Sequence, residues 1–547
     1  MTVTEAPGVV VETAADETEP TAPSGLAALV GSGDPRSVGK LFVGTSLLFL
    51  LVSGVTGVLV GFEQADTSSF DILSQDTYNQ VFTLHAIAGL FLVVLPLLLG
   101  LATAVVPLQI GASTVAFPRS SAAAYWVFLV SGGVLLASFA VNGGPYGGDS
   151  EGVRLFVVSL IAVIGALCVA TVSVVTTVIA LRTPGMSLRR VPLFSWSMLI
   201  AGSVWLLTLP ILAGILVLVY VDVTYGQQFL GGADGIYSHI RWVFWQPTVY
   251  AFAIPALGII GDIVPVFAQT RHKRHMAAKV LIGVFGAVSF GAWAQLGVVV
   301  GGATPDPTPW TFEAPWIAAS VLALVALLGL LGLWAGTLAS GRPRPASPLL
   351  LALIAGTLVL VGVAAGFGTS LKSLEVDFTT WMTGQAYAVL IGAVAAGLAG
   401  VVFWSPKLYG ALVPEGAGRL AAPLLLLGTV VVAVSYGVAG LLDQPQFPGD
   451  VSQLDDLDTI ETLNLVAAIG GVVVVLGGLL VILGVLQAGL TRPGSLGDDP
   501  WDGHTLEWAT SSPPPIGNFA GLPEISSEAP VYDARHRAAL ADTETFD

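Results

Sequence analysis

The chain of 547 residues contains few charged side chains and a single cysteine, Cys168. Charged residues make up 10% of it, whereas about 25% is usual in a soluble protein. So few charges cannot cover the water-facing surface of a chain this long, which predicts a polytopic membrane protein. One cysteine excludes a disulfide framework, a zinc ribbon and a cysteine-bound iron–sulfur cluster.

Basic residues are scarce as well. The chain has 20 Lys and Arg against 36 Asp and Glu, and its formal net charge is −16. Nucleic acid requires a basic surface, so we expect no nucleic-acid partner. Residues 1–33 are acidic and lack the basic-then-apolar order of a secretory signal, so we expect a disordered N-terminal arm there.

Long apolar runs are abundant, and each approaches the roughly 20 residues that a helix needs to cross a bilayer. They predict an all-α protein with twelve transmembrane helices. The runs lie at about 41–62, 81–108, 122–141, 153–181, 192–221, 242–268, 278–300, 313–340, 347–370, 382–403, 419–442 and 462–490. The membrane domain is therefore expected to cover 34–490.

The basic residues predict how these helices are oriented. With a cytoplasmic N-terminus and twelve crossings, 17 of the 20 Lys and Arg fall on the inner side. The three on the outer side are Arg154, Arg241 and Lys372. Residues 491–547 are polar and proline-rich, which predicts a cytoplasmic tail with little structure of its own. We expect a multi-pass protein of a prokaryotic plasma membrane, with both termini cytoplasmic.

Several short strings, in order along the chain, resemble subunit I of the heme–copper oxidases. They begin at Tyr78 to His85 and continue with Val106 to Ala112 and Ala116 to Arg119. Further strings follow; they are Arg182 to Met186, Pro192 to Trp196, Leu209 to Gly214, Asp499 to Trp501, Thr505 to Trp508 and Ser511 to Pro515. The resemblance runs from about Asp34 to Phe519. It implies the twelve-helix fold of the cytochrome c and quinol oxidases, and other oxidase subunits as partners, among them one like subunit II.

The resemblance also implies metal centres, because the family holds two hemes and one copper through histidines. Its low-spin heme uses one histidine on helix two and one on helix ten. Its high-spin heme uses another on helix ten, and its copper uses three on helices six and seven. Imidazole suits both iron and copper as a neutral nitrogen ligand.

Of these family positions, only His85 on helix two carries a histidine here. The copper positions carry Gln246, Gln295 and Leu296, which are poor copper ligands or none. The helix-ten heme positions, counted back from Phe403 to Pro406, carry Gly384 and Ala386. We therefore expect no copper, no catalytic residue, and at most one heme, held through His85.

The remaining histidines do not replace the lost ligands. His272 and His275 lie in a basic loop that we interpret as solvated and positive-inside, and His504 and His536 lie in the tail. Met382, one turn from Ala386, is an alternative axial ligand for a heme, but packing is the commoner role of a buried methionine. His239 would meet His85 only if the helices pack differently from the family.

Three hypotheses about function follow from this pattern. The first is a degenerate oxidase subunit of the respiratory chain that keeps the scaffold but has lost the oxygen-reducing centre. The second is an active terminal oxidase that passes electrons from cytochrome c or quinol to oxygen with proton translocation. The third is a non-redox transporter or assembly partner, which intramembrane ionisable residues would favour. The coherent loss of metal ligands favours the first hypothesis.

Overall fold

The computed structural model describes residues 31–66, 72–145, 148–226, 240–291, 310–446, 454, 456–491 and 497–544. Within these ranges the regular elements are all helices, so the all-α prediction is confirmed. Residues 1–30 of the predicted N-terminal arm lie outside the described residues, as do His239 and the family copper positions Gln295 and Leu296.

Ten helical segments of the described chain are long and apolar enough to cross a membrane. They match ten of the twelve predicted runs. One segment joins α3 (Gln75–Ile87), the π-helix η1 (Ala88–Val94) and α4 (Leu95–Ile110). The others are α2 (Pro35–Glu63), α5 (Pro118–Ala140), α6 (Ser150–Ala180), α7 (Leu193–Tyr225), α12 (Trp310–Ser340), α13 (Ser347–Thr369), α14 (Thr380–Phe403), α16 (Glu415–Leu441) and α17 (Leu457–Leu490).

The other two predicted runs contain shorter apolar helices. The run at 242–268 is divided into the 3-10 turns η2 (Arg241–Phe244) and η3 (Thr248–Phe252) and the helix α9 (Ile254–Ala268). Prolines at 247 and 255 each remove a backbone donor, so one uninterrupted α-helix is unfavourable there. The run at 278–300 begins with α10 (His275–Val288), and its last part lies outside the described residues.

Local chemistry explains where several helices begin and end. The Asp34 side chain accepts a hydrogen bond from the Ser37 backbone N–H at 3.0 Å, and Pro35 occupies the first turn of α2. The Ser74 hydroxyl accepts from the Thr77 N–H at 3.4 Å at the start of α3. Helix α4 ends at Gly111, whose φ of 73° is a conformation that glycine adopts without strain.

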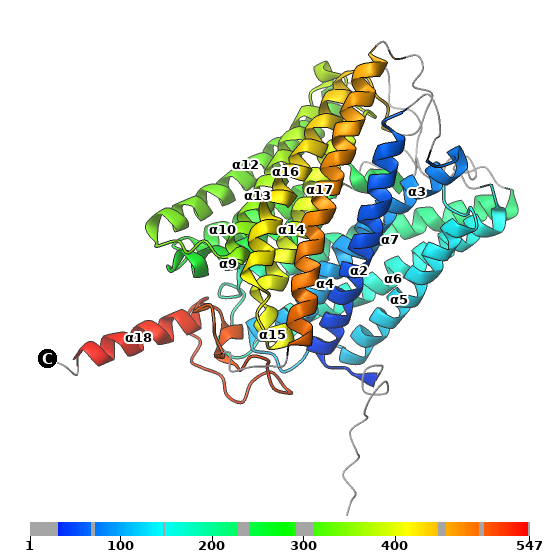
Figure 1. Cartoon of the computed structure of the whole chain (residues 1–547). Helices are drawn as coiled ribbons and strands as arrows, with labels where there is room; N and C mark the ends of the chain where they lie inside the picture. The colour runs from blue at the N-terminus through cyan, green and yellow to red at the C-terminus, as the bar shows by residue number, and fades with distance from the viewer. Residues whose placement is uncertain are drawn as a thin grey trace, which may run out of the picture. The chain divides into compact units, whose positions relative to one another are not determined.

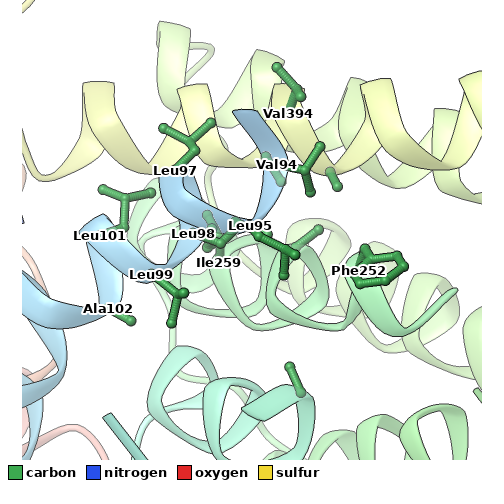
Figure 2. Close-up of a cluster of buried hydrophobic side chains, with 14 of the residues drawn as sticks. Val94, Leu95, Leu97, Leu98, Leu99, Leu101, Ala102, Phe252, Ile259 and Val394 are labelled. Atoms are coloured by element: carbon green, nitrogen blue, oxygen red, sulfur yellow. The ribbon is translucent and has the colours of Figure 1, made fainter. Parts of the chain in front are cut away.

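Among the ten long apolar segments, the one that contains α4 is the most buried, and every residue of α4 itself is buried. A helix that is apolar all round belongs inside a bundle rather than against lipid. Figure 2 shows Leu95 and Leu98 of this helix among Phe252, Ile259 and Val394, which come from η3, α9 and α14. Around it, α2 packs against α4 and α17, and α14 packs against α13 and α16 (Figure 1).

The tail contains more regular structure than its composition indicated. It forms the 3-10 turn η5 (Leu506–Ala509) and the helix α18 (Pro530–Glu544), which contact each other. The Arg271 guanidinium donates to Glu528 and to Asp533, both at 2.9 Å. The tail therefore packs against the loop before α10. It also packs against the short helix α15 (Ser405–Tyr409), where Lys407 donates to Asp498 and Thr510. Helix α15 is labelled below α14 in Figure 1.

Candidate functional site

His85 lies on α3, with its ring held between α2 and α14. Its Nδ1 lies 2.7 Å from the Ser53 carbonyl oxygen, which only accepts hydrogen bonds. The neutral tautomer assigned by this contact carries its proton on Nδ1, which leaves Nε2 as the acceptor. The Ser53 hydroxyl also donates to the His85 carbonyl oxygen at 3.2 Å. The imidazole is therefore oriented by α2.

The Nε2 atom of His85, the atom that a heme iron would need, faces the hydroxyl of Tyr387. That hydroxyl hydrogen-bonds Nε2, and the two rings stack with centroids 5.5 Å apart and an interplanar angle of 21°. Tyr387 follows Ala386 on α14. The side chain opposite Nε2 of His85, which the resemblance makes a heme-ligand position, is thus a phenol. Its hydroxyl uses the nitrogen lone pair that an iron would need.

Ala386, the expected second ligand position of the low-spin heme, lines the same cavity as His85 but has no donor atom. The alternative ligand, Met382, turns elsewhere, because its sulfur accepts a hydrogen bond from the Phe378 backbone N–H at 3.2 Å. The side chains around His85 therefore do not fit a heme ligated on both faces.

Gly384, at the family position of the high-spin heme ligand, lies where α14 presses against α16. A Cβ atom added to Gly384 would lie 2.7 Å from the carbonyl oxygen of Ala433. Real Cβ atoms essentially never approach backbone so closely. Glycine supplies no imidazole at this position, and the close approach of α16 leaves no space for a larger side chain.

Gln246, the described member of the copper positions, is buried in a cluster of neutral groups. Its Oε1 accepts from the Ser320 hydroxyl at 2.8 Å, and its Nε2 donates to the Ser370 hydroxyl at 3.0 Å. The two serine hydroxyls are 2.5 Å apart. Amide and hydroxyl groups that satisfy one another do not fit a copper ion, which prefers imidazole.

Tyr250, four residues after Gln246 in the chain, is likewise built into the packing. Its hydroxyl accepts from the Gln385 amide at 3.5 Å, and its ring lies 5.8 Å from that of Phe285. In the part of the chain that the structure describes, no three His, Cys, Asp or Glu side chains gather closely enough to hold a metal ion.

The loop histidines have a different environment from the one that the sequence suggested. His272 is only 8% exposed, so the interpretation of a solvated basic loop is wrong at this residue. His272 and His504 both line a pocket of about 30 Å³, which is also lined by Glu528 of the tail. Burial, with nearby arginines, lowers the pKa of His504 to about 3.

A polar cluster that sequence reasoning missed joins α4, α7, α9 and the junction of α14 and α15 to the tail turn η5. The Gln109 amide on α4 donates to Asp262 at 2.8 Å and to Glu507 at 3.2 Å. Its oxygen accepts from the Ser195 hydroxyl at 2.6 Å, and Trp404 Nε1 donates to Glu507 at 3.1 Å. Gln109, Ser195 and Glu507 each stand in a string that resembled the oxidases, which was the available signal.

Comparisons with known proteins agree with this architecture. The model of the family described as "Cytochrome C and Quinol oxidase polypeptide I" matches residues 37–473. The chain is 30% identical to cytochrome c oxidase subunit 1 of Bacillus subtilis over 527 residues, covering 91% of this chain and 82% of that protein. It is also 30% identical to the putative cytochrome c oxidase subunit 1-beta of Streptomyces coelicolor, covering 92% and 89%.

A solved structure described as a heme–copper terminal oxidase dimer shares the fold. The TM-score is 0.67 at 15% sequence identity, and the match covers 84% of this chain and 85% of that chain. The fold therefore defines a polytopic membrane protein with the helical bundle of the heme–copper oxidases. The chain belongs to the cytochrome c and quinol oxidase polypeptide I family.

Proposed function

We propose that the chain is a subunit I-like protein of the respiratory chain whose oxygen-reducing centre has been lost. The observation that carries the proposal is the surroundings of Gln246 and Gly384, the two described residues at the positions of metal ligands in the family's oxygen-reducing site. Gln246 is hydrogen-bonded to neutral serine hydroxyls, and Gly384 is packed against backbone. Reduction of oxygen in this family requires a metal at both places.

His85 is the remaining family ligand, and it sets a limit on any heme that the chain retains. To hold a heme, His85 would have to release the Tyr387 hydroxyl from Nε2, and Ala386 would supply no second ligand because it has no donor atom. Such a heme would be substoichiometric or high-spin. The side chains described above favour no copper and no bis-histidine heme.

The retained contacts of the tail support a structural role beside other respiratory subunits. The strings that resemble the oxidases contribute Gln109, Ser195 and Glu507 to one network that ties the tail to the bundle. We propose partners that include a subunit II-like protein, a plasma-membrane location, and cytoplasmic termini on the same side as 17 of the 20 basic residues.

The proposal is tested by purifying the chain from native membranes in mild detergent. We expect other respiratory subunits to copurify, and we expect no oxygen uptake by the isolated chain with a reduced cytochrome c or quinol donor. Oxygen uptake at an oxidase-like rate by the isolated chain would contradict the lost centre. Repeated recovery of a lone monomer would contradict the role in a complex.

A further inference from the structure

The Tyr387 hydroxyl and the His85 ring are arranged as a nucleophile beside a base. The hydroxyl bonds Nε2, and Nδ1 lies 2.7 Å from the Ser53 carbonyl oxygen, which places the ring proton on Nδ1. The Ser53 hydroxyl lies 3.3 Å from the same nitrogen. A nucleophile, a base within hydrogen-bond reach and a third group that orients the base are the usual elements of an activated nucleophile.

Two other tyrosines have amides as their hydroxyl partners. The Tyr250 hydroxyl accepts from the Gln385 amide at 3.5 Å. The Tyr436 hydroxyl donates to the Gln64 side-chain oxygen at 2.9 Å. A neutral imidazole takes up a proton near neutral pH, whereas an amide does not. Of these three tyrosines, Tyr387 is the one whose hydroxyl has a base as its partner.

Tyr387 and His85 both line a cavity of about 190 Å³, and both side chains are only half-buried. A single water needs about 10–15 Å³ of such space, so the cavity has room for a small organic molecule. The cavity extends from His85 to residues outside the long helices, because Gln64 follows α2 and Gln446 lies in the segment after α16. It therefore leads from the loop end of the bundle to Tyr387.

The lining sets the kind of molecule that the cavity admits. Among the described residues, no Lys, Arg, Asp or Glu lines it. Most of the lining is aliphatic, including Val93, Leu390 and Val475. Burying a charge without a partner is costly, so the cavity disfavours a carboxylate or a phosphate ester and favours an uncharged, mainly apolar molecule.

We propose that Tyr387 is a base-activated nucleophile that takes an acyl or sulfonyl group from a small uncharged electrophile. The Tyr387 oxygen bonds to the carbonyl carbon or sulfur of the electrophile, and the bond from that atom to its leaving group breaks. The leaving group departs with the electron pair of the broken bond, and the phenolic proton moves to His85 Nε2. The imidazolium then donates through Nδ1 to the Ser53 carbonyl oxygen, and Tyr387 is left as an ester.

The imidazole decides the rate of this step. A phenol with the ordinary pKa of about 10 is ionised to only about one part in a thousand at pH 7. A positioned general base removes the proton as the new bond forms, which contributes about 10²- to 10⁴-fold. Tyr387 should therefore react about 100-fold faster or more than Tyr436, which lines the same cavity but bonds an amide.

The test is covalent labelling of the full chain in lipid nanodiscs with phenylmethanesulfonyl fluoride, whose leaving group is fluoride. Peptide mass spectrometry over time locates the sulfonyl group, which we expect on Tyr387. Tyr387→Phe should remove this adduct, and His85→Gln should slow its formation by about 100-fold or more. Ala386→Phe, which keeps both groups but fills the cavity, should block it. Ala318→Phe, on the exposed face of α12, is the matched control and should label normally.

The outcomes also separate this inference from the proposed function, on which it does not rest. No adduct on Tyr387 in the wild-type chain would overturn it, as would equal labelling rates of Tyr387 and Tyr436. Unchanged labelling of Tyr387 in a folded His85→Gln variant would overturn the role of the base. None of these results changes the metal content of the chain, on which the proposed function depends.

Discussion

Gly384 illustrates how one residue closes a ligand position. The backbone of α14 meets that of α16 there, and an added methyl group would lie 2.7 Å from the Ala433 carbonyl oxygen. We predict that Gly384→Ala lowers the free energy of unfolding by about 1–3 kcal/mol, the usual cost of overpacking. Thermal unfolding of the detergent-purified chain measures this loss.

The matched control is Gly283→Ala on α10, where no atom lies within 4 Å of the added Cβ. That change should leave stability equal or raise it by up to about 1 kcal/mol, because alanine is the better helix former. Equal effects of the two substitutions would contradict the close approach of α14 and α16.

The sequence predicted the types of the site residues but not all of their contacts. Residue type alone predicted that Gln246 and Gly384 provide no imidazole, and it singled out His85. It could not predict that Tyr387 covers His85, because these residues are 302 positions apart and meet only when α3 packs on α14. The burial of His272 depends on the tail in the same way.

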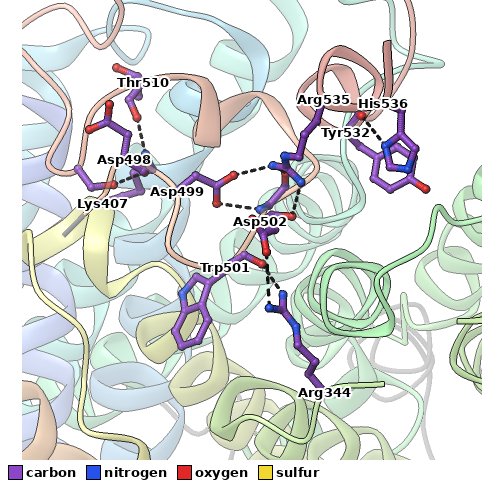
Figure 3. Close-up of polar contacts among 12 residues, drawn as sticks. Arg344, Lys407, Asp498, Asp499, Trp501, Asp502, Thr510, Tyr532, Arg535 and His536 are labelled. Carbon is purple, nitrogen blue, oxygen red and sulfur yellow. Dashed lines mark hydrogen bonds and ion pairs between the residues drawn. The ribbon is translucent and has the colours of Figure 1, made fainter. Parts of the chain in front are cut away.

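At the scale of the elements, the packing of the tail against the helices depends on a few buried polar contacts. The Lys407 ammonium donates to the carbonyl oxygens of Thr510 at 2.6 Å and Asp498 at 3.0 Å, and Figure 3 shows it beside both residues. On the far side of the same loop, Arg535 donates to Asp499 at 2.8 Å. Burial lowers the pKa of Lys407 to about 8, so its charge is retained at lower pH.

The pH dependence of tail docking follows from Glu507, which is fully buried. Burial raises the pKa of its carboxyl above the ordinary value, although hydrogen bonds from Gln109, Thr505 and Trp404 oppose this. A carboxyl group whose pKa is higher in the docked state stabilises docking fully at pH values below its pKa in the undocked state. This contribution is lost as the pH rises through the pKa of the docked state. We therefore expect docking to weaken as the pH rises above the ordinary carboxyl value of 4.5 and through the higher pKa of the docked state.

Limited proteolysis of the tail at several pH values measures this effect, with cleavage rates corrected for the protease's own pH dependence. The wild-type tail should be cleaved several-fold faster at the upper end of the range. Glu507→Gln should remove most of the difference, and Arg419→Gln, an exposed change on α16, should not. A pH dependence that persists in Glu507→Gln would contradict the assignment.

The helices themselves were largely predictable, because apolar runs must satisfy every backbone group internally in lipid. Ten of the twelve expected runs are long helices in the described chain. The run at 242–268 was less predictable, since hydropathy does not register that Pro247 and Pro255 interrupt it. The tail helix α18 was missed because polar sequence docks through pairs such as Arg271 with Glu528, which no local pattern predicts.

For the whole molecule, the proposed function separates the fold from the chemistry of the family. The chain belongs to the oxidase polypeptide I family, and the ligand positions that we infer from the resemblance carry an amide, a glycine and an alanine. Ligand-orienting groups do not replace the ligands themselves. The packing strings and the tail network are retained, which fits a protein kept for its place in a complex.

The most direct test is the metal and heme content of the purified full-length chain, by elemental analysis and by reduced-minus-oxidised spectra. We predict far less than one copper per chain and no bis-histidine low-spin heme. Any heme should be substoichiometric, high-spin and abolished by His85→Ala. One copper and two hemes per chain would contradict the account.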